Sequence, residues 1–275
     1  MTRPIAAIIL AAGKGTRMKS DLHKVLHPIA GRPMLLHLID SVKALSPERM
    51  VVVTGAGREQ VEAAVAPLGV ATALQAEQLG TGHAVAQARE ALAGFDGDVL
   101  ILYGDVPLVE ARTMRAMIDR LGEADAPAAV VLGFRPDDPA AYGRVIADRS
   151  GRIDRMVEFK DANPEERAVT LCNSGLMAVR SSDLFGLLDR VGNDNAAGEY
   201  YLPDIVMLAA ADGRHSAVIE TGAGEVAGVN SRAELAVVEG TGRSVVVRVR
   251  WPTARRSSHP RRSGSRTIPV LAATS

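Results

Sequence analysis

Cysteine, aromatic residues and long apolar runs are scarce in this sequence, and each scarcity excludes a class of protein. The single cysteine, Cys172, excludes an internal disulfide and is typical of a reducing compartment. Aromatic residues make up only 3% of the chain, which argues against binding nucleic-acid bases by stacking. No apolar run approaches the roughly 20 residues that a membrane span needs. We therefore expect a cytoplasmic protein without a membrane or nucleic-acid partner.

Charge is balanced over the whole chain but not along it. The 275 residues contain 32 Lys and Arg against 32 Asp and Glu. From Gly240 onward there is no Asp, Glu or Lys, whereas eight arginines occur there, so residues 1–239 contain 24 basic and 32 acidic residues. We expect that two different compositions are joined near Gly240. The Arg-rich segment that follows resembles a chain without a fixed fold.

The stretch 5–24 combines a buried strand with a cationic turn. Residues 5–12 (IAAIILAA) are continuously apolar, which is typical of a strand buried on both faces of a parallel sheet. A turn of small residues beside fixed positive charge suits polyphosphate binding. The turn matches neither the Walker nor the dinucleotide fingerprint, because both require glycine where Met18 stands, so a plain strand–turn–helix corner is the alternative. The cations of the stretch are Lys14, Arg17, Lys19 and Lys24.

Apolar strands alternate with amphipathic helices along most of the chain. This alternation predicts an α/β fold with a Rossmann-like, doubly wound, mostly parallel sheet. In such sheets ligands gather at the carboxyl ends of the strands, so we expect the turn after Leu10, the loop 75–82 and Asp105 to lie together. Strands are expected at 5–12, 50–53, 70–74, 98–102, 128–134, 143–147, 153–158, 170–179 and 217–220. Helices are expected at 33–45, 57–66, 81–93, 182–191 and 203–211.

Several sequence blocks, in one order, resemble a known enzyme family. The segment LAAGKGTRMKSDLHKVLHPIAGRPML is similar to the signature of the sugar-1-phosphate nucleotidyltransferases. Further similar blocks follow in order: QLGTGHAV, LYGDVPL, YGRV, VEFKDA, NSGLMAV, GEYYLPDI and AGVNSR. Within that family the chain most resembles the bacterial N-acetylglucosamine-1-phosphate uridylyltransferases (pyrophosphorylases), over about residues 4–235. The resemblance implies a nucleotidyltransferase fold of the GT-A-like kind.

The resemblance also implies roles on the nucleotide side of a site. Arg17 and Lys24 would be catalytic, because they would hold triphosphate oxygens and offset negative charge at the reacting phosphorus. Uracil offers one N–H donor between two carbonyl acceptors, which an amide side chain and backbone groups can match. Thr81 is in addition placed to cap the helix that follows it. The nucleotide-binding residues would be Leu10, Ala11, Ala12, Gly13, Lys24, Gln75, Gly80 and Thr81.

Metal and sugar residues are implied in the same way. Asp105 and Asn230 would hold Mg²⁺, which prefers oxygen ligands and usually keeps several waters and substrate phosphates. The alternatives are that Asp105 is a helix N-cap and that Asn230 is an ordinary turn residue. Tyr103, Gly104 and Asp105 would lie under the sugar and the metal. The amino sugar would be bound by Gly143, Glu158 and Asn173. Asn230 is the remaining implied substrate-binding residue.

The resemblance implies a magnesium-dependent transfer reaction. UTP and N-acetyl-α-D-glucosamine 1-phosphate would give UDP-N-acetylglucosamine and pyrophosphate, for peptidoglycan and lipopolysaccharide precursors and so for cell-wall biogenesis and cell shape. The sugar phosphate is already ionised near pH 7, so no side chain need act as nucleophile or base, and catalysis would be positioning and electrostatics. Two alternatives are a nucleotidyltransferase of other nucleotide or sugar specificity and a non-catalytic nucleotide-binding module.

The expected domain organisation follows from where the resemblance stops. We expect a uridylyltransferase domain over residues 1–230, the start of a linker helix over 231–242 and an atypical tail over 243–275. The resembling family continues with a left-handed β-helix of hexapeptide repeats, a second domain that acetylates glucosamine 1-phosphate and forms trimers. No such repeat is present here. We therefore expect neither a left-handed β-helix nor the acetyltransferase half nor the family trimer from this sequence.

Overall fold

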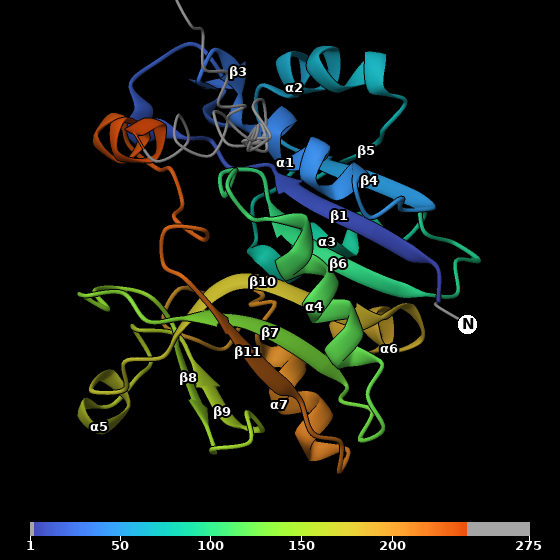
Figure 1. Cartoon of the computed structure of the whole chain (residues 1–275), viewed down its shortest axis with the longest axis vertical. Coiled ribbons are helices and arrows are strands. Elements are labelled where there is room, and N and C mark those ends of the chain that lie inside the picture. Colours follow the sequence, from blue (N-terminus) through green and yellow to red (C-terminus); the bar gives the residue numbers. More distant parts are fainter. Residues whose placement is uncertain (1–2, 241–275) are drawn as a thin grey trace, which may run out of the picture.

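A twisted sheet forms the centre of the computed structural model, which describes residues 3–240 (Figure 1). Its main path has the strand order β11-β7-β10-β6-β1-β4-β5. The central strand β1 pairs in parallel with β4 on one side and with β6 on the other. The strands are β1 (Ile5–Ala11), β4 (Arg49–Thr54), β5 (Ala71–Leu74), β6 (Asp98–Tyr103), β7 (Ala129–Phe134), β10 (Cys172–Arg180) and β11 (Ala217–Thr221).

Only β10 runs antiparallel to the other strands of that path. It pairs antiparallel with both β6 and β7, whereas β4 with β5 and β7 with β11 are parallel pairs. Two further strands, β8 (Arg144–Ala147) and β9 (Ile153–Val157), form an antiparallel extension on β10. The prediction of a Rossmann-like, mostly parallel sheet is confirmed, with one reversed strand that the alternation of elements did not indicate.

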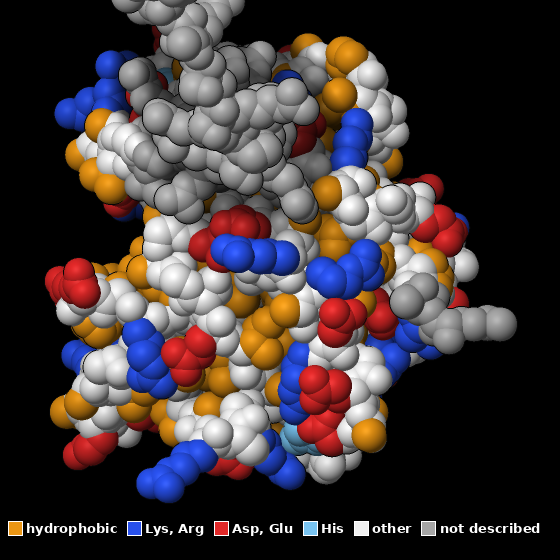
Figure 2. All heavy atoms as spheres, viewed as in Figure 1, with side chains coloured by type: hydrophobic (Ala, Val, Ile, Leu, Met, Phe, Trp, Pro, Cys, Tyr) orange, Lys and Arg blue, Asp and Glu red, His pale blue; other side chains and the backbone are white. Residues whose placement is uncertain are grey.

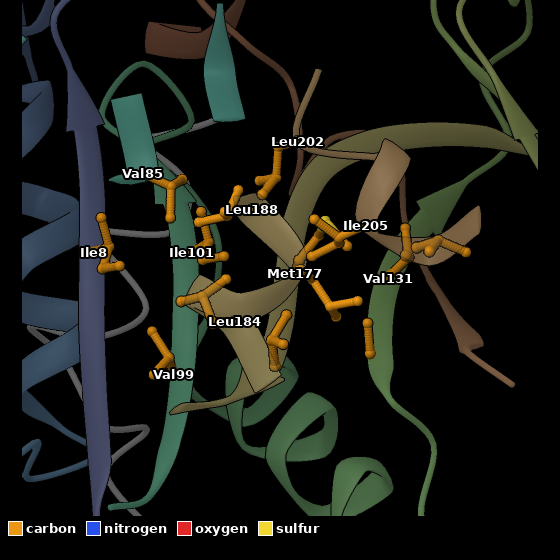
Figure 3. Packing of buried hydrophobic residues seen from close by; sticks show 14 of the residues in the cluster. Ile8, Val85, Val99, Ile101, Val131, Met177, Leu184, Leu188, Leu202 and Ile205 are labelled. Atoms are coloured by element: carbon orange, nitrogen blue, oxygen red, sulfur yellow. The ribbon is translucent and has the colours of Figure 1, made fainter. Parts of the chain in front are cut away.

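Helices cover both faces of the sheet, which is the doubly wound arrangement. Along β1, Ile5, Ala7 and Ile9 pack into one apolar cluster, and Ala6, Ile8 and Leu10 into another. The first cluster includes α1 (Met34–Lys43), α2 (Arg58–Val65) and α4 (Ala111–Leu121). The second includes α3 (Thr81–Ala86), α6 (Ser181–Leu188) and α7 (Asp204–Ala211). Figure 3 shows side chains of the second cluster from the sheet and the helices pointing toward one another.

Two helices differ from the sequence expectation. Helix α4 was not predicted, although its buried residues have helical spacing: Met114, Met117, Ile118 and Leu121. Helix α3 ends at Ala86 instead of near residue 93. Beyond it the chain forms tighter turns, in which Ala88 N donates to Val85 O (3.0 Å), the spacing of a 3₁₀ turn. The α-helical ladder is therefore not continued through this Ala-rich segment.

A small apolar cluster ties the C-terminal part of the described chain to the first turn. Residues 232–240 are helical and lie beside the N-terminal loops in Figure 1. In this cluster Val229 and Val238 pack against Met18, Ile29 and Met34. The shorter elements there are η1 (Thr16–Met18), η2 (Lys24–Leu26), β2 (Pro28–Ile29) and β3 (Arg32–Pro33); η3 (Ala66–Leu68) and α5 (Pro164–Arg167) lie elsewhere. The predicted tail 243–275 lies outside the described residues.

Within residues 3–240 no helix is both long and apolar enough to cross a membrane.

Candidate functional site

A pocket of about 270 Å³ lies at the carboxyl ends of β1, β5 and β6. Backbone hydrogen bonds align these ends, because Gly104 N donates to Leu10 O (2.9 Å) and Gln75 N donates to Thr54 O (2.8 Å). The predicted meeting of the first turn, the 75–82 loop and Asp105 is therefore observed. Ten of the predicted site residues line the pocket: Leu10, Ala11, Ala12, Gly13, Lys24, Gln75, Gly80, Thr81, Tyr103 and Asp105.

A buried amide forms one side of the pocket. Gln75 is only 3% exposed, and its Nε2 donates to Gly80 O (3.0 Å) and lies 3.1 Å from His83 Nδ1. These contacts fix which end of the carboxamide acts as donor to the protein. Among the described residues, no group donates a hydrogen bond to Gln75 Oε1, so this oxygen is the acceptor that the side chain can offer to a ligand.

The segment 199–202 closes this side of the pocket. Tyr200 N donates to Leu79 O (2.8 Å), and Gly82 N donates to Tyr200 O (2.8 Å). Thr81 was expected to cap its helix, and this expectation is wrong. The N-cap is Gly80, without a side-chain hydrogen bond, because the Thr81 hydroxyl instead accepts from Leu202 N (3.0 Å). The 75–82 loop is thus held by a segment about 120 residues further along the chain.

Gly80 occupies a backbone conformation that the pocket wall requires. Its φ is +111° and its ψ is 176°, a region that only glycine populates readily. A Cβ on this residue would lie 2.6 Å from Tyr200 O and 2.7 Å from Tyr200 N. The Gly80 carbonyl also accepts from Gln75 Nε2. The same glycine therefore allows segment 199–202 to pack closely and helps to orient the buried Gln75 amide.

An ammonium, a carboxylate and an amide meet at the other end of the pocket. Lys24 Nζ donates to Asp105 Oδ2 in a short ion pair and to Asn230 Oδ1 at 3.1 Å. The side chains of Lys24 and Asp105 are 13% and 15% exposed. Val229 N donates to Asp105 O (2.9 Å), which fixes the two acceptor residues relative to each other. Asp105 is not a helix N-cap, since Glu110 holds that position for α4.

These residues fit a divalent cation as partial ligands. The Asp105 carboxylate and the Asn230 amide oxygen converge on one positively charged atom, the Lys24 nitrogen. Both are oxygen donors of the kind that Mg²⁺ prefers. Within residues 3–240 there is no group of three or more His, Cys, Asp or Glu side chains that could hold a metal ion. A cation at this place would therefore draw its remaining ligands from substrate and water.

Arg17 is not among the residues that line the pocket. It lies exposed in η1, and the loop that carries it is held from the C-terminal side, where Arg232 Nε donates to Met18 O (3.1 Å). The structure therefore does not bring Arg17 to the Lys24 and Asp105 pair, and its catalytic role stays a prediction. Gly104 lies behind the pocket lining, against Leu10 O and Val25.

Gly143, Glu158 and Asn173 form a second group beside the first pocket. Asn173 N donates to Gly143 O (2.9 Å), and a Cβ on Gly143 would lie 3.1 Å from Glu158 Oε1. Burial raises the pKa of the Glu158 carboxyl above its ordinary value, and nearby carboxylates add to this. Glu158 faces a cavity of about 320 Å³ together with Asp161, Asp194, Asn195, Tyr201 and Asp204.

The ring of Tyr103 lies between the two groups. It lines the first pocket and packs on Gly175, where a Cβ would lie 2.7 Å from the ring. Gly175 has a φ of +87°, and its N donates to Asn173 Oδ1 (2.9 Å). Burial raises the pKa of the Tyr103 hydroxyl still further above neutral pH. The predicted nucleotide and sugar residues are thus contiguous, with Tyr103 as their common wall.

Arg144 is a structural residue of this region that the sequence did not single out. Its side chain is buried, and its guanidinium donates only to backbone carbonyls and, weakly, to Cys172 Sγ (3.9 Å). The carbonyls belong to Pro139 (3.3 Å), Ala140 (3.2 Å), Tyr142 and Arg167 (3.3 Å). Cys172 is itself buried, and this burial raises the pKa of its thiol. The YGRV block was a signal for Arg144.

Substitution of Arg144 by methionine is expected to lower the free energy of unfolding by about 2 kcal/mol. The change removes the charged donor of four partly buried hydrogen bonds to backbone carbonyls, and a hydrogen bond to a charged group contributes roughly 1.5–3 kcal/mol. Denaturant unfolding of Arg144→Met measures the loss. The control is Arg149→Met, which removes an exposed guanidinium from the next loop. Equal stability of the two variants would show that the Arg144 hydrogen bonds do not matter.

Charges of both signs are interspersed on one face of the molecule. In the space-filling view of Figure 2, Lys and Arg side chains alternate with Asp and Glu side chains below the atoms that are not described. Ion pairs of this kind on the described surface include Arg120 with Asp125 (2.7 Å) and Arg135 with Glu220 (2.9 Å). Among the side chains of residues 3–240 that Figure 2 shows, charges of the two signs are therefore mixed and not gathered into a patch of one sign.

Comparisons with known proteins give a consistent result. The family model of the MobA-like NTP transferase domain matches residues 7–163, more than half of the chain. A protein of Rhizorhabdus wittichii named bifunctional protein GlmU is 72% identical over 237 residues, which are 86% of this chain and 52% of that protein. A protein of the same name from Novosphingobium aromaticivorans is 66% identical over 259 residues, 94% of this chain and 55% of its own length. The chain thus spans about half the length of the curated relatives that it matches.

A solved structure shares the fold at low sequence identity. It is the structure of a CMP:2-keto-3-deoxy-manno-octonic acid synthetase complexed with CTP, with a TM-score of 0.65 and 18% identity. The similarity covers 88% of this chain and 99% of that one. At this identity the likeness concerns the arrangement of sheet and helices.

Proposed function

Because the chain belongs to the MobA-like NTP transferase domain family, we propose that it transfers a uridylyl group from UTP to N-acetyl-α-D-glucosamine 1-phosphate. A phosphate oxygen of the sugar phosphate attacks the α-phosphorus of UTP, and a new P–O bond forms. The bond between the α-phosphorus and its bridging oxygen breaks, and pyrophosphate leaves with the electron pair. The observation that carries the proposal is one pocket that joins the Gln75 amide, the Lys24 ammonium and the Asp105 carboxylate.

Recognition of uracil is supported by the orientation of Gln75. Its Nε2 is engaged by Gly80 O and His83, which leaves Oε1 to accept a hydrogen bond from the N3–H of uracil. Cytosine has a lone pair at N3 and would place two acceptors against each other. With cytosine bound, the buried Gln75 Oε1 would have no donor, and the cost of this unpaired acceptor favours uracil strongly over cytosine. Gly80 and Thr81 line the pocket beside this amide, and their backbone groups would bind the rest of the hydrogen-bonding edge of uracil.

The triphosphate is expected at the small-residue turn after β1. Leu10, Ala11, Ala12 and Gly13 line the pocket there, and Lys24 lies across from them. Asp105 and Asn230 would hold Mg²⁺, and this ion, when bound, offsets negative charge on the phosphates. Lys24 and the more remote Arg17 would add fixed positive charge near the α-phosphorus. No side chain need act as a base, since the attacking phosphate oxygen is ionised near pH 7.

The sugar phosphate is expected to bind beyond Tyr103. The Tyr103 ring supplies an apolar wall, and Gly143 leaves space for a close approach of the ligand to the backbone. Glu158 would accept hydrogen bonds from sugar hydroxyls, and Asn173 offers both a donor and an acceptor. In this arrangement the phosphate of the sugar lies nearest to Lys24 and Asp105, so that the two anions meet at the positive end of the pocket.

A nucleotide panel tests the proposal and the role of Gln75. We expect pyrophosphate release with UTP and the sugar phosphate, and a value of kcat/KM for CTP about 100-fold lower, because cytosine cannot donate to Gln75 Oε1. Gln75→Ala is expected to lose most of this preference. Gln78→Ala is the control, because it shortens another amide side chain of the same pocket. Equal use of UTP and CTP by the unsubstituted protein would contradict the proposed base recognition.

A further inference from the structure

The Lys24 ammonium stands where two oxygen ligands of a cation converge. It donates hydrogen bonds to both oxygens of the site, the Asp105 carboxylate and the Asn230 amide oxygen. The three residues come from η2, from the loop after β6 and from the segment before residue 232, so their meeting is a product of the fold rather than of sequence proximity. The ion pair is mostly shielded from solvent, with both side chains at most 15% exposed.

We infer that Lys24 is an internal counter-ion which competes with a divalent cation for Asp105 and Asn230 in the nucleotide-free protein. This inference rests on the proposed function, which requires the cation at these oxygens. One carboxylate cannot balance an ammonium and a divalent ion at the same place, and two cations a few ångströms apart in a partly desolvated site repel each other strongly. The cation therefore binds only when the ammonium leaves its two acceptors.

The backbones of the two residues that carry the oxygen ligands are held in place independently of Lys24. Asp105 O accepts from Val229 N (2.9 Å), and Asn230 N donates to Glu234 Oε2 (2.6 Å). Glu234 lies in the helix over residues 232–240. Removal of the ammonium would thus leave the backbones of Asp105 and Asn230 next to each other, with both side-chain oxygens available to a cation.

Lys24 can move its ammonium without moving its backbone. Its 3₁₀ turn is fixed by Leu26 N donating to His23 O (2.9 Å), and His23 N donates to Gln60 Oε1 (2.8 Å). The side chain lines the pocket opposite the turn after β1, where the triphosphate is expected. A bound triphosphate therefore offers the ammonium a second set of anionic partners within the same pocket, and its arrival frees the oxygens for the cation.

A Mn²⁺ titration of the nucleotide-free protein tests the competition directly. Free Mn²⁺ is followed by electron paramagnetic resonance in the unsubstituted chain, in Lys24→Met and in Lys14→Met. We expect Lys24→Met to bind Mn²⁺ at least about tenfold more tightly, because the competing charge is gone while the oxygens stay. Lys14→Met, which removes an exposed cation of the neighbouring turn, is expected to bind as the unsubstituted chain does. Adding Asp105→Asn to Lys24→Met is expected to abolish the gain.

Equal or weaker Mn²⁺ binding by Lys24→Met would overturn the inference, and so would an equal gain in Lys14→Met. If Lys24→Met does not fold, reductive methylation of the unsubstituted protein serves instead. Saturating Mg²⁺ is expected to raise the labelling of Lys24 several-fold relative to Lys14 and Lys19, because the ammonium is expelled; unchanged relative labelling would overturn the inference. Neither readout depends on turnover. If the protein shows the gain in Mn²⁺ binding but releases no pyrophosphate, the proposed function is contradicted and the inference about Lys24 is not.

Discussion

Asp105→Ala is expected to lower pyrophosphate release from UTP and the sugar phosphate by about a thousandfold. The carboxylate follows β6 at the pocket, and it accepts from the same Lys24 ammonium that donates to the Asn230 amide oxygen. Its loss removes the proposed cation ligand and leaves Lys24 without its counter-ion. Initial rates at saturating Mg²⁺ measure the effect.

The control for this variant is Asp96→Ala. Asp96 precedes β6, pairs with Arg3 (2.6 Å) and has an 83% exposed side chain, so its loss is expected to change neither activity nor stability appreciably. Thermal unfolding establishes that Asp105→Ala is folded. A folded Asp105→Ala protein with more than about one tenth of the original rate would contradict the role assigned to this carboxylate.

Gly80→Ala is expected to be the most damaging small substitution in the pocket wall. The φ of +111° costs an alanine roughly 1–3 kcal/mol, and its Cβ would in addition press on the backbone of Tyr200 at 2.6 Å. We expect the free energy of unfolding to fall by about 3 kcal/mol. We also expect the KM for UTP to rise about 100-fold, because the Gly80 carbonyl no longer orients Gln75.

Gly69→Ala separates backbone strain from the close contact. Gly69 has a φ of +66°, but no atom lies within 4 Å of the place of its Cβ. The left-handed conformation alone should cost this variant about 1 kcal/mol, without an effect on the KM for UTP. Denaturant unfolding and UTP kinetics of both variants measure the difference. If Gly80→Ala were no worse than Gly69→Ala in both measurements, the packing of segment 199–202 on the loop would have no role.

The position of the pocket follows from short-range patterns. The apolar run 5–12, the strand before Gln75 and the strand before Asp105 each end at a polar or small residue, and parallel strands place such ends at one edge. Each of these patterns lies within a short stretch of the chain. Together they predict that the first turn, the 75–82 loop and Asp105 meet, and the structure confirms this meeting.

Contacts between distant residues could not be predicted from the residues themselves. Lys24 lies 81 positions from Asp105 and 206 from Asn230, and no local pattern specifies their pairing. The hydroxyl of Thr81 likewise bonds to Leu202 rather than to its own helix. The direction of β10 is of the same kind, because the alternation of apolar residues that indicates a strand is the same in either direction. By contrast, the spacing of Met114, Met117, Ile118 and Leu121 is sufficient to predict α4.

The domain boundary at residue 230 stays a prediction. Residues on both sides of it contact the loop that contains Met18. Val229 and Val238 pack with Met18, and Arg232 holds the Met18 carbonyl at 3.1 Å. The loop that carries Arg17 therefore depends on residues on both sides of position 230. We propose that the catalytic unit includes the helix over residues 232–240, in addition to the predicted 1–230.

We propose that the pocket at the ends of β1, β5 and β6 joins UTP to a sugar phosphate. Phosphorus NMR of the protein with UTP, N-acetylglucosamine 1-phosphate and Mg²⁺ is the decisive experiment, because it resolves both products. We expect UDP-N-acetylglucosamine and pyrophosphate in equal amounts, and no products with Asp105→Ala. Unchanged UTP, or its hydrolysis without formation of a sugar nucleotide, would refute the proposed reaction.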